Sequence, residues 1–250
     1  MHCGESQTRM YVSAELQVGG ECFLPPPQAH HALRVLRLRA GAHVILFNGD
    51  GAEYRAVVER IEKSAVRVKV RQRVDAGRES PLEIVLGQAL SSGERMDYTI
   101  QKAVELGVAA IQPLAASRSV ARLSADRARK RLAHWQAVAI AACEQCGRNR
   151  VPRVLPLTQL DAFLASRAAQ RHGERRVLLS PRSARGLREL DRPDGGIVML
   201  AGPEGGFSQE EERAAVQSGF LPVRLGPRVL RTETAAIAAL AAMQALWGDF

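Results

Sequence analysis

Hydrophobic and polar residues alternate in the first part of the chain. Between residues 43 and 74 lie the apolar run HVILF, the turn NGDG, and the runs EYRAVVERI and AVRVKVRQRV. In the last run Val66, Val68 and Val70 point to one face of a strand, and the basic residues between them point to the other. The pattern predicts a small all-β domain that contains a β-hairpin and a further strand.

A helical spacing precedes the hairpin, in the segment HHALRVLRLRAG. Here apolar residues at Ala32, Leu33, Val35 and Leu36 lie among three arginines, as in a short amphipathic helix with a basic side. We expect this helix to end at Gly41. The β domain therefore has two basic surfaces, one on this helix and one on the last strand.

The pattern changes after the polar segment VDAGRESP, residues 74–81, which we interpret as an interdomain linker. Runs rich in valine, isoleucine and leucine then alternate with helical segments, which predicts a mostly parallel sheet covered on both faces. We assign residues 1–74 to the β domain and residues 75–250 to an α/β domain. The expected strands are LEIVLGQAL, VAAIQPLAA, RRVLLS, GGIVMLAG and LPVRLG.

Composition narrows the class of protein. No apolar run approaches the roughly 20 residues needed to span a bilayer, and the start, MHCGESQTRMYVS, lacks the layout of a signal peptide. We therefore expect a cytoplasmic protein with no membrane contact. The four cysteines, Cys3, Cys22, Cys143 and Cys146, are too few and scattered for a disulfide framework.

Cys143 and Cys146 form a C-x-x-C motif at the end of a predicted helix. A structural zinc would need a second pair of ligands at suitable spacing, and a thioredoxin-like motif would stand at the start of a helix. We favour two small helix residues and expect no metal.

The formal net charge is +9, and arginine supplies most of the positive residues. A surplus of this size indicates a polyanionic partner such as RNA, because contacts to phosphates supply much of the affinity for nucleic acid. A genome rich in G and C, which also favours arginine, is the alternative explanation. Residues 1–74 hold 11 of the 35 lysines and arginines and carry the denser charge.

Candidate chemistry gathers at three junctions between a strand and the following helix. In parallel sheets, ligands bind beyond the carboxyl ends of the strands. The first junction, VLLSPRSARG, follows Leu179, the second is AGPEGGFS at residues 201–208, and the third is GPRVLRTETA at residues 226–235.

The second junction is rich in glycine but matches no phosphate-binding motif. It lacks the lysine and serine or threonine of a P-loop and the order of a dinucleotide site, and Glu204 would repel a phosphate. Exposed backbone beside one carboxylate suits S-adenosylmethionine, which has an adenine, ribose hydroxyls, an ammonium and a sulfonium. The alternative is that Glu204 stands at a turn or pairs with an arginine. Ser208 and Glu211 are typical of a capping box.

The third junction precedes a helix, AAIAALAAMQALWG, with small apolar residues on almost every face. Such a helix is buried on several sides, and we expect it to pack in the core and against another subunit. Thr232 is the candidate N-cap. Arg228 and Arg231 stand in the tight loop beside the candidate cofactor pocket.

Together, the segments ERMDYTIQKAVELGV, EQCGRNRVP, LAGPEGGFS and LGPRVLRTETAA strongly resemble the ribosomal RNA small subunit methyltransferase E family of the SPOUT superfamily. HHALRVLRLRAG and LFNGDG extend the resemblance over nearly the whole chain. It implies a PUA-like β-barrel followed by a SPOUT-type α/β domain with a deep trefoil knot. It further implies a homodimer that uses S-adenosylmethionine to methylate N3 of a uridine in 16S ribosomal RNA of the small subunit, the family site uracil-1498.

The resemblance also implies the residues that meet the adenosyl group. They are Leu179, Leu200, Ala201, Gly202, Pro203, Glu204, Gly205, Gly206, Leu225, Gly226, Leu230, Arg231, Thr234 and Ala235.

For catalysis, methylation of N3 requires loss of its proton and stabilisation of the resulting uridine anion. Arg231 is the first candidate for that stabilisation, and Glu233 is a candidate base. Candidates for RNA contact, with a surface or capping role as the alternative, are Arg9, His30, His31, Arg34 and Arg37. Arg148 and Arg150, in EQCGRNR, are candidates for contact with RNA phosphate or the cofactor region.

Two alternative functions remain. One is a ribosome-binding protein that keeps the fold without transfer activity, for which decay of the Gly-rich loop would be expected, and that loop is intact. The other is methylation of tRNA, which other SPOUT members perform.

Overall fold

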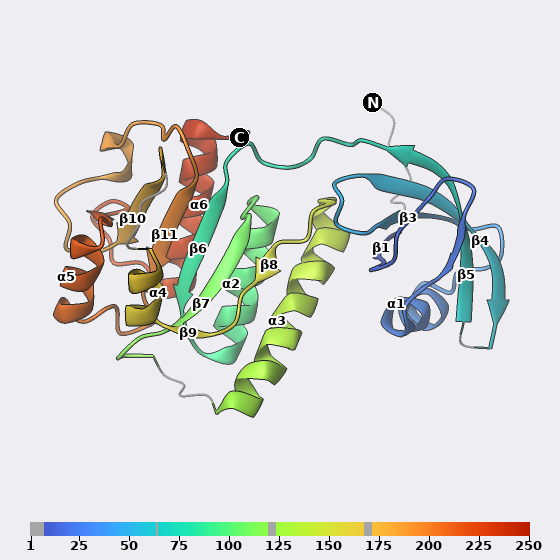
Figure 1. Ribbon diagram of the computed structural model, residues 1–250, viewed down its shortest axis with the longest axis horizontal. Helices are drawn as coiled ribbons and strands as arrows, with labels where there is room; N and C mark the ends of the chain where they lie inside the picture. Colours follow the sequence, from blue (N-terminus) through green and yellow to red (C-terminus); the bar gives the residue numbers. More distant parts are fainter. Residues whose placement is uncertain (1–7, 64, 120–123, 168–171) are drawn as a thin grey trace. The chain divides into compact units, whose positions relative to one another are not determined.

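The computed structural model describes residues 8–63, 65–119, 124–167 and 172–250. The chain divides into two compact units (Figure 1). The β unit comprises Met1–Glu79 and Cys143–Val151, and the α/β unit comprises Ser80–Ala142 and Pro152–Phe250. No helix in these described ranges is long and apolar enough to cross a membrane.

The β unit is built on a five-stranded sheet with the order β1-β3-β4-β5-β2. The first and third strands pair in parallel, and the other pairs are antiparallel. The strands are β1 (Arg9–Tyr11), β2 (Glu21–Phe23), β3 (His43–Phe47), β4 (Glu53–Glu62) and β5 (Ala65–Val74). The predicted hairpin is confirmed, because β3 and β4 pair across the NGDG turn.

The alternation predicted for β5 is also confirmed. Val66, Val68 and Val70 are buried in the core of the unit, whereas Arg71 and Arg73 are exposed. In the turn before β4, the Asp50 carboxylate accepts hydrogen bonds from the Ala52 amide at 2.8 Å and the Tyr54 hydroxyl at 2.6 Å. These bonds satisfy turn donors that the sheet leaves unpaired.

The basic helix differs from its expected bounds. It begins as α1 (Pro26–His30), continues as the π-helical turn η1 (His31–Val35), and ends well before Gly41. The physical reason is Arg37, whose φ of 52° is left-handed and leaves the helix. Ala32 is buried, but Val35 is 61% exposed, so the apolar face is narrower than expected.

The α/β unit has a sheet with the order β12-β10-β11-β6-β7-β8, and β9 pairs with β7. Every pair in it is parallel, as predicted. The strands are β6 (Ile84–Ala89), β7 (Ala110–Ala115), β8 (Arg153–Val154), β9 (Thr158–Gln159), β10 (Arg175–Leu179), β11 (Ile197–Ala201) and β12 (Leu221–Val223). The helices are α2 (Gly93–Glu105), α3 (Ala125–Cys146), α4 (Leu160–Ser166), the 3-10 turn η2 (Leu187–Glu189), α5 (Gln209–Gln217) and α6 (Thr232–Trp247).

Helices cover both faces of this sheet, as the sequence predicts. Ala89 packs in a cluster with Phe163 of α4 and Ala215 of α5. The neighbouring Gln88 points the other way and reaches Thr232 of α6. Helices α2 and α6 pack against each other on that second face (Figure 1).

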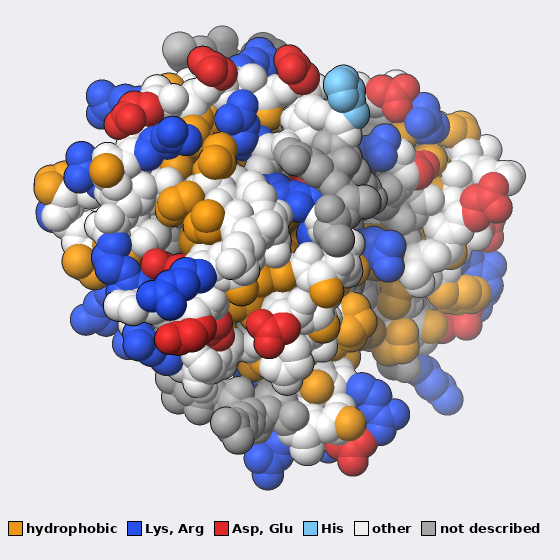
Figure 2. All heavy atoms as spheres, turned by 60° about the vertical axis from the view of Figure 1, so that its left-hand side comes forward, with side chains coloured by type: hydrophobic (Ala, Val, Ile, Leu, Met, Phe, Trp, Pro, Cys, Tyr) orange, Lys and Arg blue, Asp and Glu red, His pale blue; other side chains and the backbone are white. Residues whose placement is uncertain are grey.

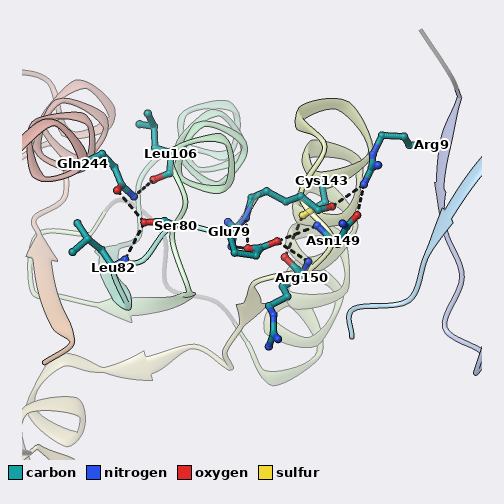
Figure 3. A network of polar contacts seen from close by, with 10 residues as sticks. Arg9, Glu79, Ser80, Leu82, Leu106, Cys143, Asn149, Arg150 and Gln244 are labelled. Carbon is teal, nitrogen blue, oxygen red and sulfur yellow. Dashed lines mark hydrogen bonds and ion pairs between the residues drawn. The ribbon is translucent and has the colours of Figure 1, made fainter. Parts of the chain in front are cut away.

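A polar network fixes α6 to the start of the α/β unit (Figure 3). The buried Gln244 donates to the Leu106 carbonyl at 2.8 Å and accepts from the Ser80 hydroxyl at 2.9 Å. The Ser80 hydroxyl in turn accepts from the Leu82 amide at 3.1 Å. These bonds hold the end of α2, the end of α6 and the entry to β6 together.

Burial of α6 within the chain is one-sided. Ala236, Leu240 and Met243 are fully buried. On the other side Leu246 is 44% exposed, and Phe250 just beyond the helix is 68% exposed. The chain thus covers one face of a helix that is apolar on nearly all faces.

Candidate active site

The structure brings the three junctions together at the carboxyl ends of three neighbouring strands. Strand β10 lies between β12 and β11, so each of the three loops leaves the same edge of the sheet. They enclose a cavity of about 240 Å³. The implied cofactor residues that line it are Leu179, Ala201, Gly202, Pro203, Glu204, Gly205, Gly206, Leu225, Gly226, Leu230 and Ala235.

Three implied residues do not line this cavity. Leu200 is fully buried in the sheet core, and Arg231 and Thr234 are exposed. Arg228, expected beside the pocket, also lines it. The further lining residues, which were not predicted for the site, are Ser180, Pro181, Arg182, Phe207, Glu212, Val223, Arg224, Val229 and Thr232. Their common signal is position, because all stand within the three junctions or beside them.

The first junction is tied to the third by backbone bonds. The Ser180 amide donates to the Val223 carbonyl at 2.9 Å, and the Arg224 amide donates to the Arg185 carbonyl at 2.9 Å. Within the cavity wall, Glu212 of α5 accepts from the Ser180 hydroxyl at 3.3 Å and lies 2.8 Å from Arg182. Glu212 therefore fixes the first loop against α5.

The Gly-rich loop is a tight turn. The Gly206 amide donates to the Pro203 carbonyl at 2.8 Å, and Gly206 has a φ of +66°, which favours glycine. A Cβ at Gly202 would lie 3.1 Å from the Phe207 nitrogen, so the backbone is close-packed there. The predicted capping box is confirmed, since Ser208 and Glu211 exchange hydrogen bonds at the start of α5.

Glu204, the carboxylate inside that loop, contacts the start of α2. Its Oε1 accepts from the Ser92 amide at 2.9 Å and from Arg95 Nη1 at 3.1 Å. Burial raises the pKa of Glu204, but the hydrogen bonds from the Ser92 amide and Arg95 outweigh it and leave that pKa below its usual value. Glu204 is thus an ionised anchor that also lines the cavity, and the arginine pairing considered as an alternative is present.

Thr232 corrects the expected N-cap. Arg231 has extended backbone angles and is the N-cap, whereas Thr232 is the first helical residue of α6. The Thr232 hydroxyl donates to the Gly202 carbonyl at 2.5 Å and accepts from Gln88 Nε2 at 3.1 Å. The sequence-based prediction did not include Gln88, although an amide in an otherwise apolar strand is a visible signal. In the structure Gln88 is fully buried, and a buried amide needs a hydrogen-bond partner.

The two catalytic candidates differ in surroundings. Arg231 is exposed at the start of α6. The Glu233 side chain is 15% exposed, its Oε1 lies 3.9 Å from Arg95 Nε, and its buried Oε2 has no hydrogen-bond partner among the described residues. Glu233 therefore faces α2, and one of its carboxylate oxygens is free of hydrogen bonds to the described residues.

Arg9 and Arg148 contact other residues of the β unit, and their contact with RNA stays a prediction. Arg9 donates to Asn149 Oδ1 at 2.6 Å (Figure 3). It also donates to Glu53 at 2.9 Å, and its side chain is 8% exposed. Arg148, also with an 8% exposed side chain, pairs with Glu79 at 2.8 Å. Both guanidiniums are paired within the β unit, as burial of a charge requires, and Arg9 Nε has no hydrogen-bond partner among the described residues.

The other candidates for RNA contact are accessible. His30, His31, Arg34 and Arg37 are exposed on α1, η1 and the turn that follows, and Arg150 is also exposed. Figure 2 shows acidic side chains lying between basic ones on the face that it presents. The positive surplus is therefore not one continuous field on that face.

The C-x-x-C motif stands at the end of α3, as expected. Burial raises the pKa of Cys143 to about 12, and its Sγ lies 3.7 Å from the Arg150 carbonyl. Among the described residues no group of His, Cys, Asp and Glu could hold a metal ion, and Cys3 lies outside these residues. Cys143 is thus a buried thiol of low reactivity.

Family comparisons agree with this architecture. An RNA methyltransferase domain matches residues 78–244, and an RNA methyltransferase PUA domain matches residues 24–71. The ribosomal RNA small subunit methyltransferase E of Buchnera aphidicola is 32% identical over 97% of this chain and 94% of its own length. That of Bacillus subtilis is 33% identical over 86% of each chain.

Solved structures give the same result. Ribosomal RNA small subunit methyltransferase E from Neisseria gonorrhoeae, bound to S-adenosyl methionine, is 43% identical, with a TM-score of 0.91 over 98% of this chain and 99% of its own. A putative methyltransferase from Legionella pneumophila, in complex with the same cofactor, is 42% identical, with a TM-score of 0.92 over 98% and 99%. The chain therefore belongs to the ribosomal RNA small subunit methyltransferase E family.

Proposed function

We propose that this protein transfers a methyl group from S-adenosylmethionine to N3 of a uridine in 16S ribosomal RNA, at the family site uracil-1498. The observation that carries the proposal is the cavity where three strand ends meet, lined by a Gly-rich loop and the Glu204 carboxylate. Two similar proteins were crystallised with S-adenosylmethionine, which supports the same ligand here.

The residues around the cavity fit a cation with an adenosyl group. Gly205 and Gly206 place backbone in the cavity wall without side chains, and Leu179, Leu225 and Leu230 offer apolar contact to an adenosyl group. Glu204 brings a carboxylate of lowered pKa to this lining. A carboxylate in the wall favours a ligand with a sulfonium and an ammonium.

Bound S-adenosylmethionine would supply an activated methyl group, and the chain's own residues would position and activate the uridine. We assign to Arg231 the stabilisation of the negative charge that spreads onto O2 and O4 when N3 loses its proton. We assign to Glu233 the role of base, since its Oε2 has no hydrogen-bond partner among the described residues. Positioning of N3 in line with the methyl carbon supplies much of the remaining rate gain.

The proposal extends to partners and domains. Residues 1–74 form a PUA-like RNA-binding domain, and residues 75–250 form a knotted SPOUT domain. Contact with 16S RNA is assigned to the exposed side chains of His30, His31, Arg34, Arg37 and Arg150. The half-covered face of α6, which ends at the exposed Leu246, is assigned to a homodimer interface, because a face so apolar is seldom left in water.

A methylation assay on separated RNAs tests the function. The purified protein is incubated with labelled S-adenosylmethionine and 16S RNA, assembled small subunits or tRNA, and N3-methyluridine is identified by mass spectrometry. We expect label in 16S RNA, free or in subunits. Label only in tRNA would overturn the substrate, and cofactor binding with no methylation of any RNA would favour the non-catalytic ribosome-binding alternative.

A further inference from the structure

One arginine beside the cavity contacts two carboxylates that come from different elements. Arg95 lies in the first turn of α2. Its Nη1 is 3.1 Å from Glu204 in the Gly-rich loop, and its Nε is 3.9 Å from Glu233 in the first turn of α6. Glu204 also accepts the Ser92 amide, which belongs to the N-cap of α2. The start of α2 thus holds the loop after β11 and the start of α6 at once.

Other contacts fix the remaining parts of the same loop. The Gly202 carbonyl accepts from the Thr232 hydroxyl at 2.5 Å, and Thr232 is held by the buried Gln88. The Gly205 carbonyl accepts from Arg118 Nη1 at 3.0 Å. Arg95 differs from both because it reaches the side chain at the corner of the loop and the helix that carries Arg231.

Arg95 acts through its neighbours. Among the described residues, those that line the cavity come from the three junctions and from α5 and α6, and none belongs to α2. The Arg95 side chain is 39% exposed, whereas Glu204 and Glu233 are 22% and 15% exposed, so Arg95 is the most accessible of the three. An arginine can contact two carboxylates because its fork presents several donors in fixed directions.

We propose that Arg95 is a positioning residue of the methyltransferase site, holding the Gly-rich loop and the start of α6 in one arrangement. This inference rests on the proposed function, since it concerns the same site. Through Glu204, Arg95 fixes the position of one side chain in the wall of the cofactor cavity. Through Glu233, it fixes the first turn of α6, which directly follows Arg231. Preorganisation of this kind lowers the cost of binding and of reaching the transition state.

A purely electrostatic role for Arg95 makes a different prediction. S-adenosylmethionine carries a sulfonium charge that S-adenosylhomocysteine lacks. If Arg95 only balanced charge, its removal would strengthen binding of the sulfonium ligand relative to the neutral thioether. A positioning residue affects both ligands equally, because both use the same loop.

The experiment measures binding of both ligands by calorimetry to the full chain and to Arg95→Gln, Arg95→Lys and Lys102→Gln. Lys102→Gln is the matched control, since it removes one positive charge from the same helix at a side chain paired with Glu105. We expect Arg95→Gln to raise both dissociation constants by about tenfold and the control to match the wild type. Arg95→Lys should fall between them, because one ammonium reaches Glu204 but cannot span both carboxylates.

Two further readouts separate positioning from stability. At saturating cofactor and RNA, kcat of Arg95→Gln should fall by roughly tenfold, while its thermal midpoint stays with that of Lys102→Gln. In a double-mutant cycle, Glu204→Gln combined with Arg95→Gln should weaken binding by less than the product of the two single effects, because they remove one contact.

Each contrary outcome is decisive. Wild-type binding and turnover in Arg95→Gln would overturn the inference while leaving the proposed function intact. Unequal changes in the two dissociation constants would show that Arg95 balances charge and does not position the loop. A loss of binding accompanied by a lower thermal midpoint would show that Arg95 stabilises the fold. A folded wild type that binds neither ligand would overturn the proposed function, and this inference with it.

Discussion

Each unit holds a cluster in which arginine meets glutamate, and the two clusters differ in burial. In the β unit, the Arg9 and Glu53 side chains are 8% and 5% exposed. In the α/β unit, Arg95 and Glu204 are 39% and 22% exposed, and Glu204 lines a cavity. The same two residue types therefore serve the fold in one place and a ligand site in the other.

The comparison teaches that burial decides the role of an arginine. A guanidinium taken out of water needs partners inside the fold, because an unpaired buried charge is costly. Glu53 pairs with both Arg9 and Arg78, since Arg78 Nη1 lies 3.2 Å from the Glu53 carboxylate. The buried cluster therefore joins several segments of the β unit. At the cavity, by contrast, solvent weakens each pair, and the contacts orient loops more than they stabilise them.

The largest expected effect follows from breaking the buried cluster. Glu53→Gln leaves the Arg9 guanidinium buried beside a neutral partner, and we expect the β unit to lose about 3–5 kcal/mol of stability. Hydrogen exchange should show faster exchange in β3, β4 and β5 and unchanged protection in β11. Arg60→Ala, which breaks the exposed pair with Glu62, is the control and should change neither. Equal exchange in both variants would remove the distinction between the buried cluster and an exposed ion pair.

The next effect concerns the rate of methyl transfer at the site beside the cavity. Arg231→Ala should lower kcat by roughly 10²–10³-fold, because it removes a donor to the developing charge, with little change in the thermal midpoint. Arg188→Ala, at an exposed arginine of η2 that does not line the cavity, is the matched control. Single-turnover methylation of 16S RNA measures both, and near-normal turnover in Arg231→Ala would sink its assignment.

Much of this architecture was predictable from residue patterns. The alternation of Val66, Val68 and Val70 fixed the faces of β5, and the Val-rich runs between helices indicated the parallel sheet. The three junctions could be located because parallel strands end at one edge. The motif from Ser208 to Glu211 also gave the start of α5, since a capping box is a local signal.

Long-range pairing was the part that local patterns could not supply. The contacts of Glu204 with Ser92 and Arg95 join residues more than 100 positions apart, so no spacing rule reveals them. Burial of Arg9 depends equally on partners near positions 53 and 149. The early end of the basic helix reflects the left-handed backbone at Arg37, an arginine where glycine or asparagine would be the usual signal.

A smaller effect is expected from the hydroxyl that joins the loop to α6. Thr232→Val keeps the shape of the side chain but leaves the Gly202 carbonyl and Gln88 without their shared partner. We expect a loss of about 1–3 kcal/mol in stability of the α/β unit and weaker binding of S-adenosylmethionine. Thr232→Ser retains the hydroxyl and should behave as the wild type in both urea unfolding and calorimetry. A valine variant that matches the serine variant would show that the bond contributes nothing.

The smallest expected effect is a pH dependence of cofactor affinity that comes from Glu204. Because the pKa of Glu204 is lowered in the folded protein, its contacts with Ser92 and Arg95 are fully present above the ordinary carboxyl value of 4.5. They are lost only as the pH falls through the lowered value in the fold. Cofactor affinity should therefore be flat from neutral pH down to about 4.5 and weaken only below it. In Glu204→Gln the affinity should start lower and lose this component of its pH dependence. If calorimetry showed the same loss of affinity at low pH in the variant, the titrating group would be another carboxylate.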